Sequence, residues 1–315
     1  MDTYNPQHLP FFPTPYPGES LYSILCRYHV RSGNATTRKT ILQLFGTFGS
    51  LCSTLLLPSM LNCFESWVSA ETSIAADELF RNNTAYSLCA LRSFSEYNYC
   101  FADGFSIPSR KYYRRNFRQC LLQHPSDKLR YCPNCAADQK KLYGESYWQI
   151  LPQLDGIEYC PIHHTRISTT AIHTRDLLYS FFPADVVLSD ISPDYSISES
   201  PWYHGALIDR FPELFVGMAK TIAYLWEHLP KYSGIWALLH RYRLFLSTEN
   251  KYWQLTECAR ELLLKRDISP MVSSLISNIS YLENGYFFPS SFALSEHAML
   301  ITMLSSSPQA FFSLQ

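Results

Sequence analysis

The sequence lacks the signatures of the common enzyme classes. It contains no G-x-S-x-G, no phosphate-binding loop, no H-E-x-x-H and no paired-carboxylate motif. Nothing in it therefore predicts hydrolase, nucleotide-binding or metalloprotease chemistry. We expect a protein that is not an enzyme.

Targeting and membrane signals are also missing. The opening MDTYNPQHLPFFP has neither the charged region nor the apolar region of a secretory signal. Thr40 to Phe64 carries no charge, but Gly46, Gly49 and Pro58 interrupt it, which favours a buried helix, a loop and a second helix over a membrane span. We expect a protein of the reducing cytoplasm, whose cysteines do not form disulfides.

Two cysteine-containing knuckles are the most informative feature that is present. Cys132-Pro-Asn-Cys135 is followed, after 24 residues, by Cys160-Pro-Ile-His163. Three thiolates and one imidazole suit Zn²⁺, and four protein ligands leave no position for a reacting water. The spacing predicts one structural zinc ion, whose binding contributes to folding.

Other uses of these cysteines are weaker. A redox dithiol at Cys132 and Cys135, or two unmetallated loops, would leave the second knuckle unexplained. Cys120, His124 and His164 could form a second site or supply substitute ligands, but no fourth partner is evident.

The N-terminal segment predicts a helix-turn-helix. From Glu19 to Val30, apolar residues recur at helical spacing. Ser32-Gly33-Asn34 breaks the pattern, and a second helix follows with Ile41, Leu44 and Phe45 on its inner face. The outer face of this second helix would offer three side chains to DNA: Arg38, Lys39 and Gln43. An ordinary helical pair in a helical core explains the same pattern.

A basic amphipathic helix is predicted from Ser109 to Gln123. Its cationic face is a candidate for contacts with phosphates or with an acidic partner, although exposed charged faces are common on helices. The residues of that face are Arg110, Lys111, Arg114, Arg115 and Arg118.

The rest of the chain completes a mainly α fold. We expect a helical domain with the helix-turn-helix over residues 1–125, a small Cys₃His zinc-finger module over 126–185, and a helical region over 186–315. Tyr143 to Trp148 would cover the metal site, with Trp148 in the core. Asp185 to Pro201 reads as a linker. Helices are expected at 207–228, 235–246, 256–265 and 295–304.

Several of these motifs together resemble the TniQ family, and most closely its TnsD-like branch. The resemblance covers residues 10 to 170. It is carried by Pro15-Tyr16-Pro17-Gly18-Glu19-Ser20-Leu21-Tyr22-Ser23, Arg27-Tyr28, Ser32-Gly33-Asn34, Asn83-Thr84, Tyr131-Cys132-Pro133-x-Cys135, Tyr143-Gly144-Glu145 with Tyr147-Trp148, and Cys160-Pro161-x-His163.

The resemblance implies a non-enzymatic target-site selector of a bacterial multi-gene transposon, associated with the nucleoid. The implied partners are double-stranded DNA and the AAA+ ATPase TnsC. A CRISPR RNA-guided surveillance complex and a second copy of this chain are alternative partners, and a stand-alone zinc-containing transcriptional regulator is an alternative function. The candidate ATPase surface combines aromatic residues with arginines of the first helix, which are typical of interface hot spots. Its residues are Phe11, Phe12, Tyr16, Arg27 and Arg31.

Overall fold

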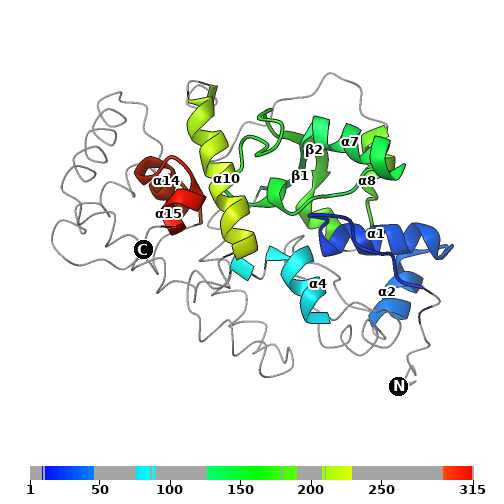
Figure 1. Ribbon diagram of the computed structural model, residues 1–315. Helices are drawn as coiled ribbons and strands as arrows, with labels where there is room; N and C mark the ends of the chain where they lie inside the picture. The colour runs from blue at the N-terminus through cyan, green and yellow to red at the C-terminus, as the bar shows by residue number, and fades with distance from the viewer. Residues whose placement is uncertain are drawn as a thin grey trace.

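The computed structural model describes residues 9, 11–45, 76–85, 87–88, 126–178, 180–189, 208–209, 211–228 and 294–313. These residues are mostly helical, with one two-stranded antiparallel sheet, so the expected mainly α class is confirmed (Figure 1). Within the described residues, no helix has the length and apolar character needed to cross a bilayer.

The first helix of the N-terminal pair is α1, Leu21–Arg31. It begins at Ser20, whose hydroxyl accepts a hydrogen bond from the backbone N–H of Ser23 at 3.2 Å, a standard N-cap. Its predicted apolar stripe is buried, since Ile24, Leu25 and Tyr28 are all fully enclosed.

The second helix, α2, covers Thr37–Phe45. Gly33 turns the chain with a φ of 65°, a conformation that glycine adopts without strain. Thr36 then caps α2 by accepting from the N–H of Lys39 at 3.2 Å. The expected inner face of α2 is buried, and the predicted helix-turn-helix order is therefore present.

A small sheet supports the two cysteine knuckles. Strand β1, Lys128–Tyr131, pairs with β2, Ser168–His173, in antiparallel register with Tyr131 opposite Ser168. The first knuckle follows β1 directly, and the second precedes β2. Short 3₁₀ helices, η2 (Leu151–Gln153) and η3 (Thr174–Leu178), complete this segment.

An unexpected helix, α7, spans Pro133–Tyr143 between the knuckles. Its signals were present in the sequence. Pro133 occupies the first turn, where its missing N–H costs nothing, and Gly144 ends the helix in the left-handed conformation with a φ of 79°. We had predicted only a turn or strand over Tyr143 to Trp148, so α7 is an addition to the prediction.

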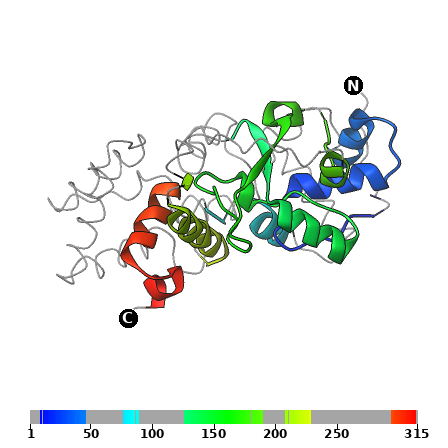
Figure 2. The ribbon, with the colours of Figure 1, turned by 90° about the horizontal axis from the view of Figure 1, so that it is seen from above.

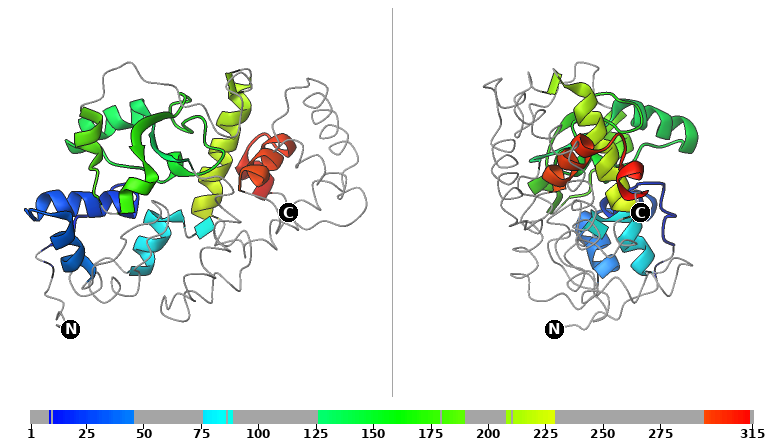
Figure 3. Two further views of the ribbon diagram at one scale, coloured as in Figure 1. Left: turned by 180° about the vertical axis from the view of Figure 1, so that it is seen from behind. Right: turned by 60° about the vertical axis from the view of Figure 1, so that its left-hand side comes forward.

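Backbone pairing joins the knuckle segment to α1. The Ser20 N–H donates to the Trp148 carbonyl at 2.8 Å, and the Ile150 N–H donates to the Gly18 carbonyl at 3.1 Å. Trp148 is fully buried, as predicted, and its indole N–H donates to the Phe182 carbonyl at 2.7 Å. The views from above and behind show the same adjacency of α1 and this segment (Figures 2 and 3).

The remaining described helices lie on the other side of the knuckle segment. Helix α4, Ala76–Asn83, contacts α1, and α10, Pro212–His228, packs against α14, Leu294–Leu304, and α15, Pro308–Ser313. Figures 1 and 2 place α10 between the knuckle segment and α14. The predicted helices at 207–228 and 295–304 correspond to α10 and α14, whereas those at 235–246 and 256–265 lie outside the described residues.

The linker expected from Asp185 is wrong at its start. Residues Ala184–Ser189 form helix α8. Asp185 anchors this helix to the end of α7, because its carboxylate accepts from Lys140 Nζ at 2.6 Å and from the Ser146 N–H at 3.1 Å. Two tertiary contacts thus order residues whose composition suggests a loop. Residues 190–201 lie outside the described range.

Candidate metal centre

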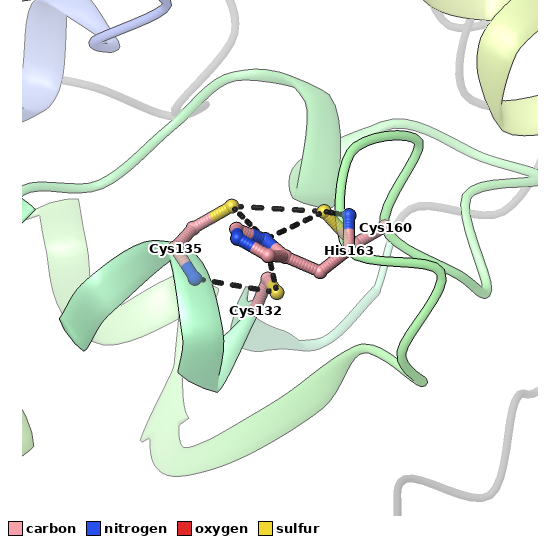
Figure 4. Close-up of side chains that lie close together, drawn as sticks. All are labelled: Cys132, Cys135, Cys160 and His163. Carbon is pink, nitrogen blue, oxygen red and sulfur yellow. Dashed lines mark hydrogen bonds between the residues drawn. The ribbon is translucent and has the colours of Figure 1, made fainter. Parts of the chain in front are cut away.

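Four side chains from the two knuckles converge on one point, as Figure 4 shows. Cys132 caps the N-terminus of α7, and Cys135 lies in its first turn. Cys160 and His163 come from the turn before β2. The pairing of β1 with β2 therefore brings together two halves of a site that lie 25 residues apart between Cys135 and Cys160.

The spacing of the donor atoms fits a four-coordinate ion. The Nδ1 atom of His163 lies 3.7 Å from Cys132 Sγ, 3.3 Å from Cys135 Sγ and 3.6 Å from Cys160 Sγ. Cys135 Sγ and Cys160 Sγ are 3.6 Å apart, and the four donor atoms all lie within 4.8 Å of one another. A tetrahedral Zn²⁺ ion separates its sulfur and nitrogen ligands by roughly 3.5 to 3.8 Å. The four residues can hold such an ion.

Each knuckle orders its own first cysteine in the same way. The N–H of Cys135 donates to Cys132 Sγ at 3.5 Å, and the N–H of His163 donates to Cys160 Sγ at 3.4 Å. The second turn closes through His164, which adopts a φ of 54°. His164 is exposed and does not belong to the group of four. Cys120 and His124, the other candidates for a second site, lie outside the described residues.

The three buried thiols differ in their proton affinity. Hydrogen bonds with Cys135 and Cys160 lower the pKa of Cys132. The same hydrogen bonding with Cys132 is the main cause that raises the pKa of Cys135 and the pKa of Cys160. Without a cation, the three sulfurs thus share one negative charge. A bound divalent cation would favour the loss of all three protons, since thiolates are the ligands.

The four-ligand arrangement determines what the centre can do chemically. All three cysteines are buried, and all four tetrahedral positions would be taken by protein atoms. A closed centre of this kind stabilises a fold and leaves no position for an activated water.

Two of the three α2 residues predicted to contact DNA lie on the surface. Arg38 and Lys39 are exposed. Gln43 is half-buried, and its amide oxygen accepts from Asn34 Nδ2 at 2.7 Å. The residues of the predicted basic helix, Arg110, Lys111, Arg114, Arg115 and Arg118, lie outside the described range.

The predicted partner surface needs one correction. Arg27 does not lie on an exposed face, because its side chain is only 6% exposed and forms ion pairs with Glu19 at 2.8 Å and Glu145 at 2.9 Å. Burial became possible because two carboxylates and the ring of Tyr16 surround the guanidinium, which lies 3.8 Å from the ring centroid. Arg31 is 44% exposed and also contacts Glu145. Helical spacing alone gave no indication of these partners.

The aromatic members of that surface are half-buried. The ring of Phe11 packs on Tyr28 with centroids 5.1 Å apart. Tyr16 stacks on Tyr143 at 4.3 Å and donates its hydroxyl proton to Glu145 at 2.9 Å. Tyr16 therefore links the N-terminal segment to the end of α7.

Sequence reasoning missed this polar cluster, which we define as Tyr16, Glu19, Arg27, Arg31 and Glu145. Burial raises the pKa of Glu19 to about 7, against the opposing effect of Arg27. A signal for the cluster existed, because four of its members belong to the motifs quoted above for the family resemblance.

Together these observations define a class: a helical protein in which a closed Cys₃His centre is docked on a helix-turn-helix pair. The TniQ family model matches residues 10–167, half of the chain. The chain belongs to the TniQ family.

A curated relative narrows the comparison. Over 158 residues the chain is 27% identical to the transposon Tn7 transposition protein TnsD of Escherichia coli. The match covers 48% of this chain and 30% of the relative. The chain therefore spans less than a third of the relative's length.

Proposed function

We propose that this protein selects the target site of a multi-gene transposon and acts as a non-enzymatic adaptor. The observation that carries the proposal is the TniQ match over residues 10–167, which includes both the helix pair and the metal centre. The printed role of the E. coli relative in transposition supports it. In this proposal the protein binds target DNA and recruits the AAA+ ATPase TnsC, which then directs the transposase.

The metal in this proposal is one structural zinc ion held by Cys132, Cys135, Cys160 and His163. The donor set and its spacing support zinc over harder cations, which prefer oxygen ligands. When bound, the ion crosslinks the two knuckles and adds its binding free energy to folding. Elemental analysis of the purified protein tests this, with one equivalent of zinc per chain expected.

The exposed face of α2 is the proposed contact with DNA. Arg38 and Lys39 would pair with phosphates, because both are exposed cations on the second helix of the pair. A double substitution, Arg38→Ala with Lys39→Ala, should weaken binding and reduce the log–log salt slope by roughly one unit per lost contact. Mobility shifts at several salt concentrations measure both quantities.

A matched control separates this face from general surface charge. Arg175 is 77% exposed and lies on η3, close to Asp176. Arg175→Ala should leave the affinity and the salt slope unchanged. Equal weakening by both sets of substitutions would argue for nonspecific attraction, and no binding by any variant or by the original chain would refute a DNA role for α2.

The proposed ATPase surface is centred on Phe12 and Arg31, beside the cluster at the end of α7. Arg31 is partly exposed, and Phe12 is half-buried. In a pull-down with the ATPase loaded on DNA with ATP, Phe12→Ala should reduce capture without changing zinc content or helicity. Full capture by this variant would refute the surface. Neighbouring ATPase and transposase genes would separate an adaptor from a stand-alone regulator.

A further inference from the structure

The orientation of the His163 ring identifies which nitrogen faces the metal position. All three cysteine sulfurs approach Nδ1, at 3.7, 3.3 and 3.6 Å. The ring in Figure 4 accordingly turns its Nδ1 edge toward the sulfurs. A neutral imidazole that offers the Nδ1 lone pair to a cation carries its proton on Nε2. The Nε2–H group then needs an acceptor.

Asp138 supplies that acceptor. Its Oδ2 atom lies 2.9 Å from His163 Nε2. Asp138 follows Cys135 by three residues on α7, and residues at this spacing lie on the same side of a helix. The helix that presents one sulfur ligand therefore also presents the carboxylate that meets the histidine of the other knuckle.

We propose that Asp138 is the positioning residue of this centre: it holds His163 in the tautomer protonated at Nε2, so that Nδ1 is the metal ligand. Metal-bound histidines commonly donate their second N–H to a carboxylate, which fixes the ring orientation and raises the basicity of the ligand. The proposal rests on the metal binding proposed above. It adds a fifth functional residue, which the Cys-Cys-Cys-His spacing does not include.

A plain surface ion pair is the competing explanation. Asp138 is 71% exposed, and an exposed pair between a carboxylate and a charged histidine contributes little to stability. That explanation predicts no role for Asp138 in metal affinity. It also makes Asp138 a suitable site for substitution, because an exposed side chain can be removed without disturbing the core.

Metal affinity of the full chain distinguishes the two. Chelator competition for Zn²⁺ should show that Asp138→Ala raises the dissociation constant about 10- to 100-fold. Asp138→Asn, which retains a neutral acceptor, should fall between Ala and the original residue, and Asp138→Glu should restore part of the loss. Asp176→Ala is the matched control, since Asp176 is also exposed and does not contact the centre. It should bind zinc like the original chain.

Two spectroscopic measurements complete the test. Co²⁺-loaded Asp138→Ala should keep the absorption of a tetrahedral Cys₃His site, because no ligand is lost. Long-range ¹H–¹⁵N spectra of the zinc-loaded original chain should show His163 protonated at Nε2. Metal bound through Nε2, or an Asp138→Ala affinity within about twofold of the original, would overturn the proposal. A chain that binds no zinc at all would instead refute the metal site itself.

Discussion

Arg27 and Glu145 lie 118 positions apart in the sequence and form an ion pair, with Nε 2.9 Å from Oε1. Arg27 comes from α1, and Glu145 directly follows the glycine that ends α7. The helix that carries two predicted zinc ligands therefore ends at a contact with the helix-turn-helix pair. This contact links the metal centre to the N-terminal helices.

Removal of the Glu145 charge should loosen that link. Glu145→Gln would leave Arg27 with Glu19 as its only carboxylate partner among the described residues, and weakening a buried ion pair costs about 1–3 kcal/mol of unfolding free energy. Urea denaturation measures the change. Glu227, 63% exposed on α10, provides the control, and Glu227→Gln should stay within about 0.5 kcal/mol of the original. Equal effects of the two substitutions would contradict the link.

Loss of two sulfur ligands should remove the metal. The double variant Cys132→Ser with Cys135→Ser should lose about one equivalent of zinc and unfold at lower temperature, because the ion contributes folding free energy. Metal content is measured by elemental analysis. Cys26→Ser is the matched control, since Cys26 is a buried cysteine outside the centre, and it should retain its zinc. One equivalent of zinc in the double variant would rule out this assignment.

Stability should depend on pH through Glu19. Burial raises its pKa from the usual 4.5 to about 7, so the folded protein retains a proton that the unfolded chain has already released. The unfolding free energy should therefore fall as pH rises from about 4.5 to 7, by up to about 1.4 kcal/mol per pH unit. Above pH 7 both states are ionised, and this contribution stays constant.

The variant Glu19→Gln isolates that effect. Gln cannot ionise, so the difference in stability between the variant and the original chain should change between pH 5 and 7 and then level off. Denaturation series at fixed excess zinc measure this difference and remove the contribution of the metal centre. A difference that stays flat across the window would show that Glu19 does not titrate as described.

A close approach at Gly156 should make this position intolerant of side chains. A Cβ atom there would lie 2.9 Å from Ser295 Cβ on α14, and the φ of 82° adds strain. Gly33→Ala is the matched control, because its φ of 65° is similar and nothing lies within 4 Å. The control should cost about 1–2 kcal/mol, and Gly156→Ala should cost about 1–3 kcal/mol more. Equal costs would indicate that the knuckle segment and α14 do not pack as described.

Local signals predicted the features that depend on neighbours in the sequence. The spacing of four ligands identified the metal centre, helical periodicity identified α1 and α2, and the burial of Trp148 was anticipated. Helix α7 had clear end signals at Pro133 and Gly144, and the attention given to the knuckles obscured them. The linker prediction failed at Asp185 because two tertiary hydrogen bonds outweigh a loop-like composition.

The sequence by itself thus determined the ligand set and the helices, since both follow from residue type and spacing along the chain. Only the tertiary structure decided that Arg27 is buried and that Nδ1 of His163 faces the sulfurs. It also placed Asp138 beside His163. Each depends on partners 8 to 118 positions away. Periodicity records which face of a helix is apolar, but it does not record which distant carboxylate will neutralise a charge on that face.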